Sequence, residues 1–238
     1  NELKNVMKAE LRDIRKKYAE PRKTEIRDEI SEIKISELDM VTKEDFVVCI
    51  SGAGYVKKHS LKVMASNENE YPTVKEGDYI EGFYKVNNLD TILLFTNLGN
   101  YLFLPVREIA ESKFKDVGTH VSSIIKVSDG ERIVKTIAVH QFDDSIITAF
   151  SKNGMVKRMP LNVLEVSRYT KPISMFKLKE DDELINVSRF DGKEAIVITN
   201  DGYGLKYNVS EIPVVGIRTS GVKAIKLNAF AQVVNGFV

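Results

Sequence analysis

The sequence contains no tryptophan, only one cysteine and no apolar run long enough to cross a membrane. One cysteine excludes a disulfide within the chain, and we interpret Cys49 as a small core residue of a protein from a reducing compartment. We find no signal peptide and expect a cytoplasmic protein. Basic and acidic residues balance, at 35 and 34 of 238, so net charge gives no argument for nucleic acid.

Motifs of the common enzyme classes are also missing. The sequence has no GxxxxGK[ST], no GxGxxG after a strand, no HExxH and no GxSxG. His59, His120 and His140 lack the spacing of metal ligands. The carboxylates at Asp143–Asp144 and Asp181–Glu183 fall at predicted turns, so we interpret them as solvated turn acids. We therefore expect no catalytic residue and no metal site in this chain.

Four stretches share one pattern, in which an apolar strand is followed by a turn ending in glycine and by a second strand. They begin at Phe46, Thr91, Ser145 and Glu194 and align on Gly54, Gly99, Gly154 and Gly202. Further strand pairs lie between them, and another pair begins at Gly221. Because one hairpin cannot bury its apolar face alone, the copies must pack on one another. We predict an all-β, closed or radial fold in which each unit holds about four strands.

A helical segment is predicted before the strands. Asn1–Ala19 carries an apolar stripe at a spacing of three and four residues, made of Leu3, Met7, Leu11, Ile14 and Tyr18. Pro21 should end this helix, and Thr24 should cap a second one with a buried side made of Ile26, Ile30 and Ile33. The apolar period then changes to two. We therefore expect a helical segment over residues 1–36 and a β domain over residues 37–238.

Basic residues recur after the turn glycines. The first and third stretches read Gly54-Tyr55-Val56-Lys57-Lys58 and Gly154-Met155-Val156-Lys157-Arg158, the fourth keeps Lys206, and the second has Leu102-Phe103 instead. Equivalent positions of a repeat fall on equivalent surfaces, so these residues predict a basic arc that could neutralise the phosphates of a bent duplex. Solubilising charges on strand edges are the alternative interpretation.

The sequence resembles the A subunits of bacterial type IIA topoisomerases. Lys17-Tyr18, Arg22-Lys23-Thr24 and Ile26 match the "KYGDxRRTxI" segment of that family, and the GYVKK hairpin matches its GYxKR repeats, while Ala19, Glu20 and Pro21 depart from the pattern. The resemblance implies a propeller-like β-pinwheel of about five to six four-stranded blades that exchange strands with their neighbours. A short helical segment would precede it, the last blade would be incomplete, and DNA would lie on the outer edge.

The resemblance also assigns DNA contacts by position. The principal contacts would be Lys57, Lys58, Lys157, Arg158 and Lys206. Further contacts, in segments that border the hairpins, would be Lys62, Arg168, Lys171, Arg218 and Lys223. Because Leu102-Phe103 replaces the basic pair, the second blade should hold DNA poorly.

Within the family, one stretch separates topoisomerase IV from gyrase. Gyrase A subunits carry a basic "QRRGGKG" box soon after the first hairpin, whereas Ala65–Asp78 reads ASNENEYPTVKEGD and is acidic. The resemblance therefore favours the topoisomerase IV type of A subunit, and a gyrase type with a degenerate box is the alternative. Its C-terminal domain would bind and bend DNA, presenting a duplex for ATP-dependent strand passage in relaxation, decatenation and chromosome segregation.

The resemblance places the chemistry elsewhere. DNA cleavage and ATP hydrolysis would belong to other parts of the holoenzyme, which uses ATP and Mg²⁺, so this chain would be non-catalytic and bind no cofactor. Its partners would be double-stranded DNA, the B subunits of topoisomerase IV and a second copy of its own type, without a membrane, in the cytoplasm and on the chromosome. A propeller that binds protein partners through its flat face is the alternative from a different functional class.

Overall fold

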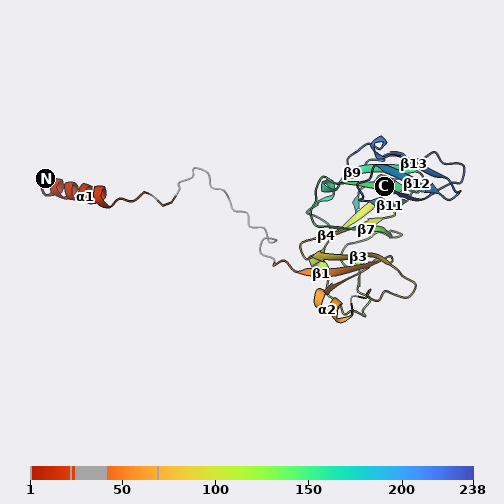
Figure 1. Cartoon of the computed structure of the whole chain (residues 1–238), viewed down its shortest axis with the longest axis horizontal. Coiled ribbons are helices and arrows are strands. Elements are labelled where there is room, and N and C mark those ends of the chain that lie inside the picture. Colours follow the sequence, from red (N-terminus) through yellow and green to blue (C-terminus); the bar gives the residue numbers. More distant parts are fainter. Residues whose placement is uncertain (1, 22, 25–41, 69) are drawn as a thin grey trace. The chain divides into compact units, whose positions relative to one another are not determined.

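The computed structural model describes residues 2–21, 23–24, 42–68 and 70–238. The chain divides into two units, Asn1–Met40 and Val41–Val238, which we describe separately (Figure 1). The predicted second helix and the predicted domain boundary at residue 36 lie outside the described residues. No helix in the described part of the chain has the length and apolar character needed to span a membrane.

The first unit contains the predicted N-terminal helix, α1 (Glu2–Tyr18). Glu2 in its first turn and Arg15, Lys16 and Lys17 in its last turn complement the helix dipole. The residues of its apolar stripe are all more than half exposed: Leu3, Met7, Leu11, Ile14 and Tyr18. All residues of α1 are exposed within the first unit.

Four antiparallel hairpins form the second unit and confirm the four predicted stretches. They are β1 (Asp45–Ser51) with β2 (Tyr55–Ser60), β4 (Thr91–Thr96) with β5 (Asn100–Pro105), β8 (Ile146–Ser151) with β9 (Met155–Pro160), and β12 (Glu194–Thr199) with β13 (Gly204–Asn208). The predicted turn glycines all have positive φ: Gly54, Gly99, Gly154 and Gly202. After the first hairpin comes the short helix α2 (Leu61–Ser66).

Each hairpin lies within one sheet, and we call the four sheets blades 1 to 4 in chain order. The sheet orders are β3-β1-β2-β6, β10-β5-β4-β7, β11-β8-β9-β14 and β13-β12-β15. The added strands are β3 (Ile80–Asn87), β6 (Thr119–His120), β7 (Ile133–Val139), β10 (Ile173–Ser174), β11 (Leu184–Ser188), β14 (Val222–Lys223) and β15 (Val233–Phe237). The fold is thus the all-β, propeller-like pinwheel that the sequence predicted.

Strand exchange between blades explains why the described residues form fewer blades than the sequence predicted. Strand β6 follows the hairpin of blade 2 but pairs with β2 of blade 1, and β10 and β14 return to blades 2 and 3 in the same way. The segment from Gly221, predicted to open a fifth unit, therefore completes blade 3, and β15 belongs to blade 4. The described residues form three four-stranded blades and one three-stranded blade, rather than the predicted five to six.

The blades pack face to face through alternating side chains. Leu94 on one face of β4 packs towards Val48 and Ile50 of blade 1, whereas Leu93 on the other face packs towards Ile147 of blade 3. A third cluster joins blade 3 to blade 4. Since a central strand such as β4 is covered on both faces, it reads as a nearly continuous apolar run. Cys49 is buried, as predicted.

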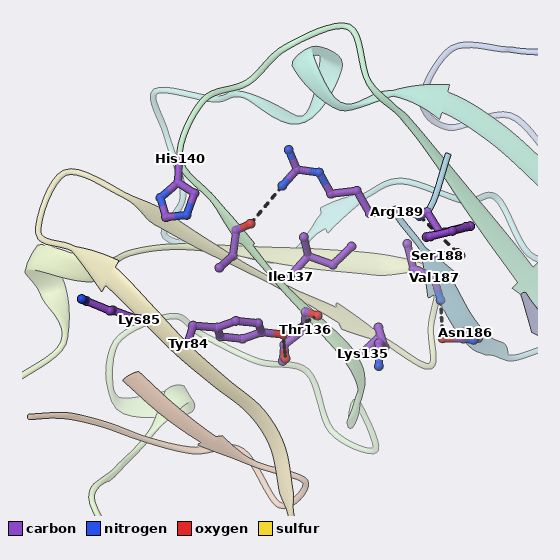
Figure 2. A pocket seen from close by; sticks show the side chains of 12 residues that line it. Tyr84, Lys85, Lys135, Thr136, Ile137, His140, Asn186, Val187, Ser188 and Arg189 are labelled. Atoms are coloured by element: carbon purple, nitrogen blue, oxygen red, sulfur yellow. Dashed lines mark hydrogen bonds between the residues drawn. The ribbon is translucent and has the colours of Figure 1, made fainter. Parts of the chain in front are cut away.

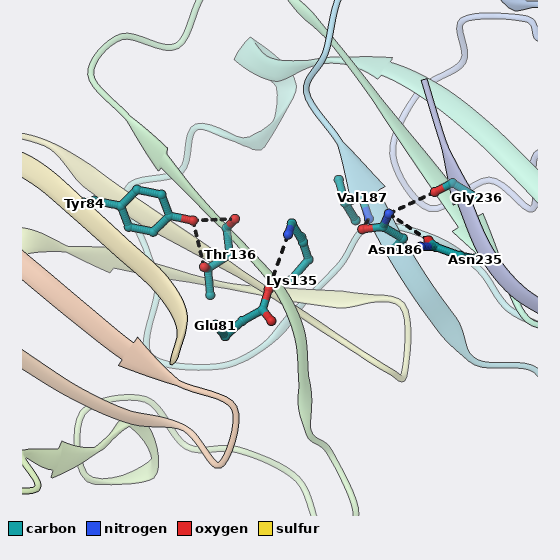
Figure 3. Close-up of polar contacts among 8 residues, drawn as sticks. All are labelled: Glu81, Tyr84, Lys135, Thr136, Asn186, Val187, Asn235 and Gly236. Atoms are coloured by element: carbon teal, nitrogen blue, oxygen red, sulfur yellow. Dashed lines mark hydrogen bonds and ion pairs between the residues drawn. The ribbon is translucent and has the colours of Figure 1, made fainter. Parts of the chain in front are cut away.

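One edge strand of each blade meets its neighbours: β3, β7, β11 and β15 contact one another in succession. Polar side chains join these strands across the blades (Figure 3). The Tyr84 hydroxyl donates to the Thr136 carbonyl at 2.8 Å, and Asn186 Nδ2 donates to the Gly236 carbonyl at 2.9 Å. We call this side of the blades the inner edge, and the side that carries β6, β10 and β14 the outer edge.

The acidic turns differ in part from the solvated turns that the sequence predicted. Asp143–Asp144 is exposed, but Asp182 is only 7% exposed. Its carboxylate accepts hydrogen bonds from the Asn153 and Glu183 backbone amides at 2.8 and 2.9 Å and from the Ser151 hydroxyl at 2.7 Å. Asp182 is therefore a structural group that holds the turn of the third hairpin.

Candidate nucleic-acid interface

The structure buries two of the lysines that were predicted to contact phosphates. Lys57 and Lys157 take equivalent places in β2 and β9, opposite Cys49 and Ala149, and are 1% and 0% exposed. Burial lowers the pKa of Lys57 and lowers that of Lys157 to about 8, because the charged form is costly to desolvate. The predicted DNA contacts at Lys57 and Lys157 are therefore wrong, since water and phosphate are excluded from both ammonium groups.

The second members of the basic pairs also lie between blades. Lys58 is 7% exposed, and its Nζ donates to the Val106 carbonyl at 3.2 Å, in the 3-10 turn after β5. Arg158 is half-buried, and its Nη1 donates to the Val209 and Ile212 carbonyls at 3.0 and 3.3 Å, beside the corresponding turn after β13. The prediction of an exposed basic arc is thus corrected at these positions as well.

Blade 2 differs at the same positions. Leu102 and Phe103 are 0% and 7% exposed and belong to the apolar clusters on the two faces of that blade. Because the basic pairs of blades 1 and 3 are themselves buried or half-buried, this replacement says nothing about how blade 2 holds DNA. The prediction of a weak second blade therefore loses its basis.

The other predicted contacts are exposed. Lys206 on β13 forms an ion pair with Glu194 of the same hairpin at 3.0 Å. Lys62 lies on α2, and the rest lie near or on the exchanged strands: Arg168, Lys171, Arg218 and Lys223. The structure therefore brings four of the predicted residues to the outer edge of the blades.

These four residues belong to the segments that cross from one blade to the one before it. We call residues 110–120, 165–174 and 214–223 the crossing segments, because each leads into β6, β10 or β14. Val56 pairs with Thr119, Tyr101 with Ile173 and Val156 with Val222, which fixes how the three segments align. In this alignment Arg218 takes the place of Lys115.

Sequence reasoning missed Lys113 and Lys115, which are exposed on the first crossing segment. A signal for them exists, because Lys115-Asp116-Val117-Gly118 and Arg218-Thr219-Ser220-Gly221 both place a basic residue three positions before a glycine. Among the described residues, the side chains of six exposed crossing-segment residues form neither an ion pair nor a hydrogen bond: Lys113, Lys115, Arg168, Lys171, Arg218 and Lys223. Three consecutive blades thus carry unpaired positive charge at the same edge.

A cavity of about 560 Å³ at the inner edge offers no comparable site (Figure 2). Its cationic groups are largely engaged with the protein, since Arg189 Nη1 donates to the Ala138 carbonyl at 3.0 Å and Lys135 lies 3.5 Å from Glu81. Lys85 points away from the other labelled side chains (Figure 2). The cavity therefore holds inter-blade contacts rather than groups that converge on a ligand.

Comparison with known proteins identifies the repeated blades. Residues 90–140, 146–191 and 193–235 match the family model of the DNA gyrase C-terminal domain, beta-propeller. The chain is 38% identical over 229 residues to the A subunit of DNA topoisomerase 4 from Staphylococcus aureus, covering 95% of this chain and 29% of that relative. The chain thus spans less than a third of the relative's length.

Solved structures agree on the fold. The crystal structure of the C-terminal domain of DNA topoisomerase IV is similar, with a TM-score of 0.79 at 36% identity over 83% of this chain and 62% of that chain. A DNA gyrase A C-terminal domain has a TM-score of 0.58 at 19% identity over 82% of this chain and 64% of that chain, a likeness of fold alone. This chain belongs to the family of DNA gyrase C-terminal domains with the β-propeller fold.

Proposed function

We propose that the unit Val41–Val238 binds double-stranded DNA along its crossing segments, as the C-terminal domain of a topoisomerase IV A subunit. The observation that carries this proposal is the set of six exposed, unpaired basic side chains on three consecutive crossing segments. Side chains of this kind neutralise phosphates without reading base sequence. Exposed Lys62 and Lys206 extend the proposed contact surface.

The dependence of duplex affinity on salt concentration tests this interface. Each phosphate contact contributes about 0.9 to the slope of log affinity against log salt. A Lys115→Gln/Lys171→Gln/Arg218→Gln variant, which neutralises one charge in each crossing segment, should reduce this slope by about 2.7. Lys85→Gln/Lys179→Gln/Lys193→Gln is a matched control of three exposed lysines outside the crossing segments, and it should keep the wild-type slope. Equal slopes for the two variants would contradict the proposal.

The acidic stretch Ala65–Asp78 supports a topoisomerase IV role over a gyrase role, because it puts phosphate-repelling charge where gyrase carries its basic box. Ligation of nicked circles in the presence of this chain should therefore shift the linking number only slightly, and a large shift would favour a gyrase-like wrap. In the holoenzyme, the domain would present a duplex for ATP- and Mg²⁺-dependent strand passage together with the B subunits and a second copy of its own type, on the chromosome.

A further inference from the structure

We propose that the buried residues Lys57 and Lys157 are positioning residues for DNA binding, because each fastens a crossing segment beside its exposed basic side chain. The DNA part of this inference rests on the proposed function, whereas the fastening itself does not. Lys57 and Lys157 occupy the same position of the repeat in blades 1 and 3. The inference explains this shared position by the fastening of a crossing segment rather than by contact with phosphate.

Lys57 binds the backbone of the first crossing segment on both sides of Lys115. Its Nζ donates to the Asp116 carbonyl at 2.8 Å and to the Phe114 carbonyl at 3.5 Å, and it also bonds to the Thr73 carbonyl. Lys115 lies between the two bonded carbonyls of its own segment. A single buried ammonium therefore fixes the backbone on both sides of an exposed lysine.

Lys157 repeats this arrangement in blade 3. Its Nζ donates to the Met175 carbonyl at 2.7 Å and to the Thr219 carbonyl at 3.4 Å, next to Arg218. The Arg218 amide also donates to the Met175 carbonyl at 3.0 Å. Lys157 thus lies where the third crossing segment meets Met175, the residue directly after the second crossing segment, and it links both to β9.

Sheet pairing alone holds these segments weakly. Strands β6 and β14 are each two residues long, and these two crossing segments are otherwise paired with β2 and β9 at single parallel bridges, Glu111 with Lys58 and Val214 with Arg158. A buried ammonium is costly unless its donors are satisfied, and buried carbonyls are costly unless they accept. Each buried ammonium therefore depends on the carbonyls that accept its hydrogen bonds. The Met175 and Thr219 carbonyls also accept the Arg218 and Lys177 amides, so removing the Lys157 ammonium removes the bonds that tie these two carbonyls to β9.

Blade 2 shows an apolar solution to the same problem. Leu102 replaces the lysine, and the Phe103 ring packs on Tyr169 with the ring centroids 5.6 Å apart. Tyr169 takes the place of Lys115 and Arg218 in its crossing segment, as the strand pairing aligns them. The second crossing segment therefore uses the position of Tyr169 for packing against its blade. Its basic residues, Arg168 and Lys171, lie on either side of that position.

The test replaces Lys157 by methionine in the whole chain. Without DNA, amide hydrogen exchange over residues 214–223 should become at least about tenfold faster, with blade 1 unchanged. With DNA, the salt slope should fall by about 1.8, as expected when Arg218 and Lys223 no longer lie in place. Leu102→Met in blade 2 is the matched control and should leave residues 214–223 and the slope as in the wild type.

A double-mutant comparison separates positioning from general destabilisation. Arg218→Gln/Lys223→Gln should lower the salt slope in the wild type but cause little further loss beside Lys157→Met, under conditions in which every variant is folded. Independent, additive losses, or exchange at the wild-type rate, would overturn the inference.

If Arg218→Gln/Lys223→Gln had no effect in the wild type, the proposed interface would fail while the exchange result would still decide the fastening role. If Lys157→Met does not fold, Lys57→Met with Lys115→Gln tests the same inference in blade 1.

Discussion

Replacement of Gly221 by alanine should lower the free energy of unfolding by about 3 kcal/mol. Gly221 has a φ of +65°, and an added Cβ would lie 2.3 Å from the Val156 carbonyl oxygen. Since that oxygen belongs to β9, the third crossing segment would have to move away from its blade. Urea unfolding followed by circular dichroism measures the loss.

Two other glycines separate the causes of that loss. Gly202 has a φ of +85° with no atom within 4 Å of an added Cβ, so Gly202→Ala should cost only about 1–2 kcal/mol of conformational strain. Gly216 has open space and no positive φ, so Gly216→Ala should change stability by less than about 0.5 kcal/mol. Equal losses for Gly221→Ala and Gly202→Ala would contradict a role for close packing against β9.

Replacement of Asp182 by alanine should also destabilise the fold, by about 3 kcal/mol. The change removes the acceptor of hydrogen bonds from the buried Ser151 hydroxyl and from the part-buried Asn153 and Glu183 amides, which lose this partner. Asp129→Ala is the control, because Asp129 is an exposed acid in a turn and has no side-chain bond among the described residues. A loss no larger than that of the control would mean that the acidic turn is merely solvated.

A carboxylate that accepts hydrogen bonds at the turn of a hairpin also occurs in blade 1, at Asp78. It makes the stability of the fold depend on pH. Burial alone would raise the pKa of Asp78, but polar groups around its carboxylate lower the pKa overall, among them the Tyr79 and Ala53 amides, which donate to Asp78 Oδ1 at 2.8 and 3.0 Å. A carboxyl group with a lower pKa in the folded state stabilises the fold above its unfolded-state pKa. That contribution is lost as the pH falls through the lower, folded-state pKa.

The fold was largely readable because its signals are local. The apolar run in Thr91–Thr96, turn glycines such as Gly99 and the stripe of α1 are each set by neighbouring residues. The blade number was not readable, because strand exchange is a long-range pairing. Val222–Lys223 follows the hairpin of blade 4 yet pairs with β9, and nothing in those two residues specifies that partner.

The candidate site shows the same limit at the level of single side chains. The common register of Lys57 and Lys157 was detected, but register does not distinguish a lysine on the surface from one covered by a crossing segment. The covering chain comes from residues 114–116 and from residues 175 and 219, which are distant in sequence. The basic position shared by Lys115 and Arg218 in the crossing segments points to exposed charge more reliably than the basic pairs do. It is harder to detect in the sequence, because blade 2 carries Tyr169 at that position.

The central claim is that DNA binds along the crossing segments and not at the buried lysines. Amine-reactive labelling of the lysines, with and without duplex DNA and quantified by mass spectrometry, tests this claim most directly. We predict that DNA protects Lys113, Lys115, Lys171 and Lys223, that exposed Lys85 and Lys193 react equally in both states, and that buried Lys57 and Lys157 stay unreactive throughout. Protection of Lys85 and Lys193 with no change at the crossing segments would contradict it.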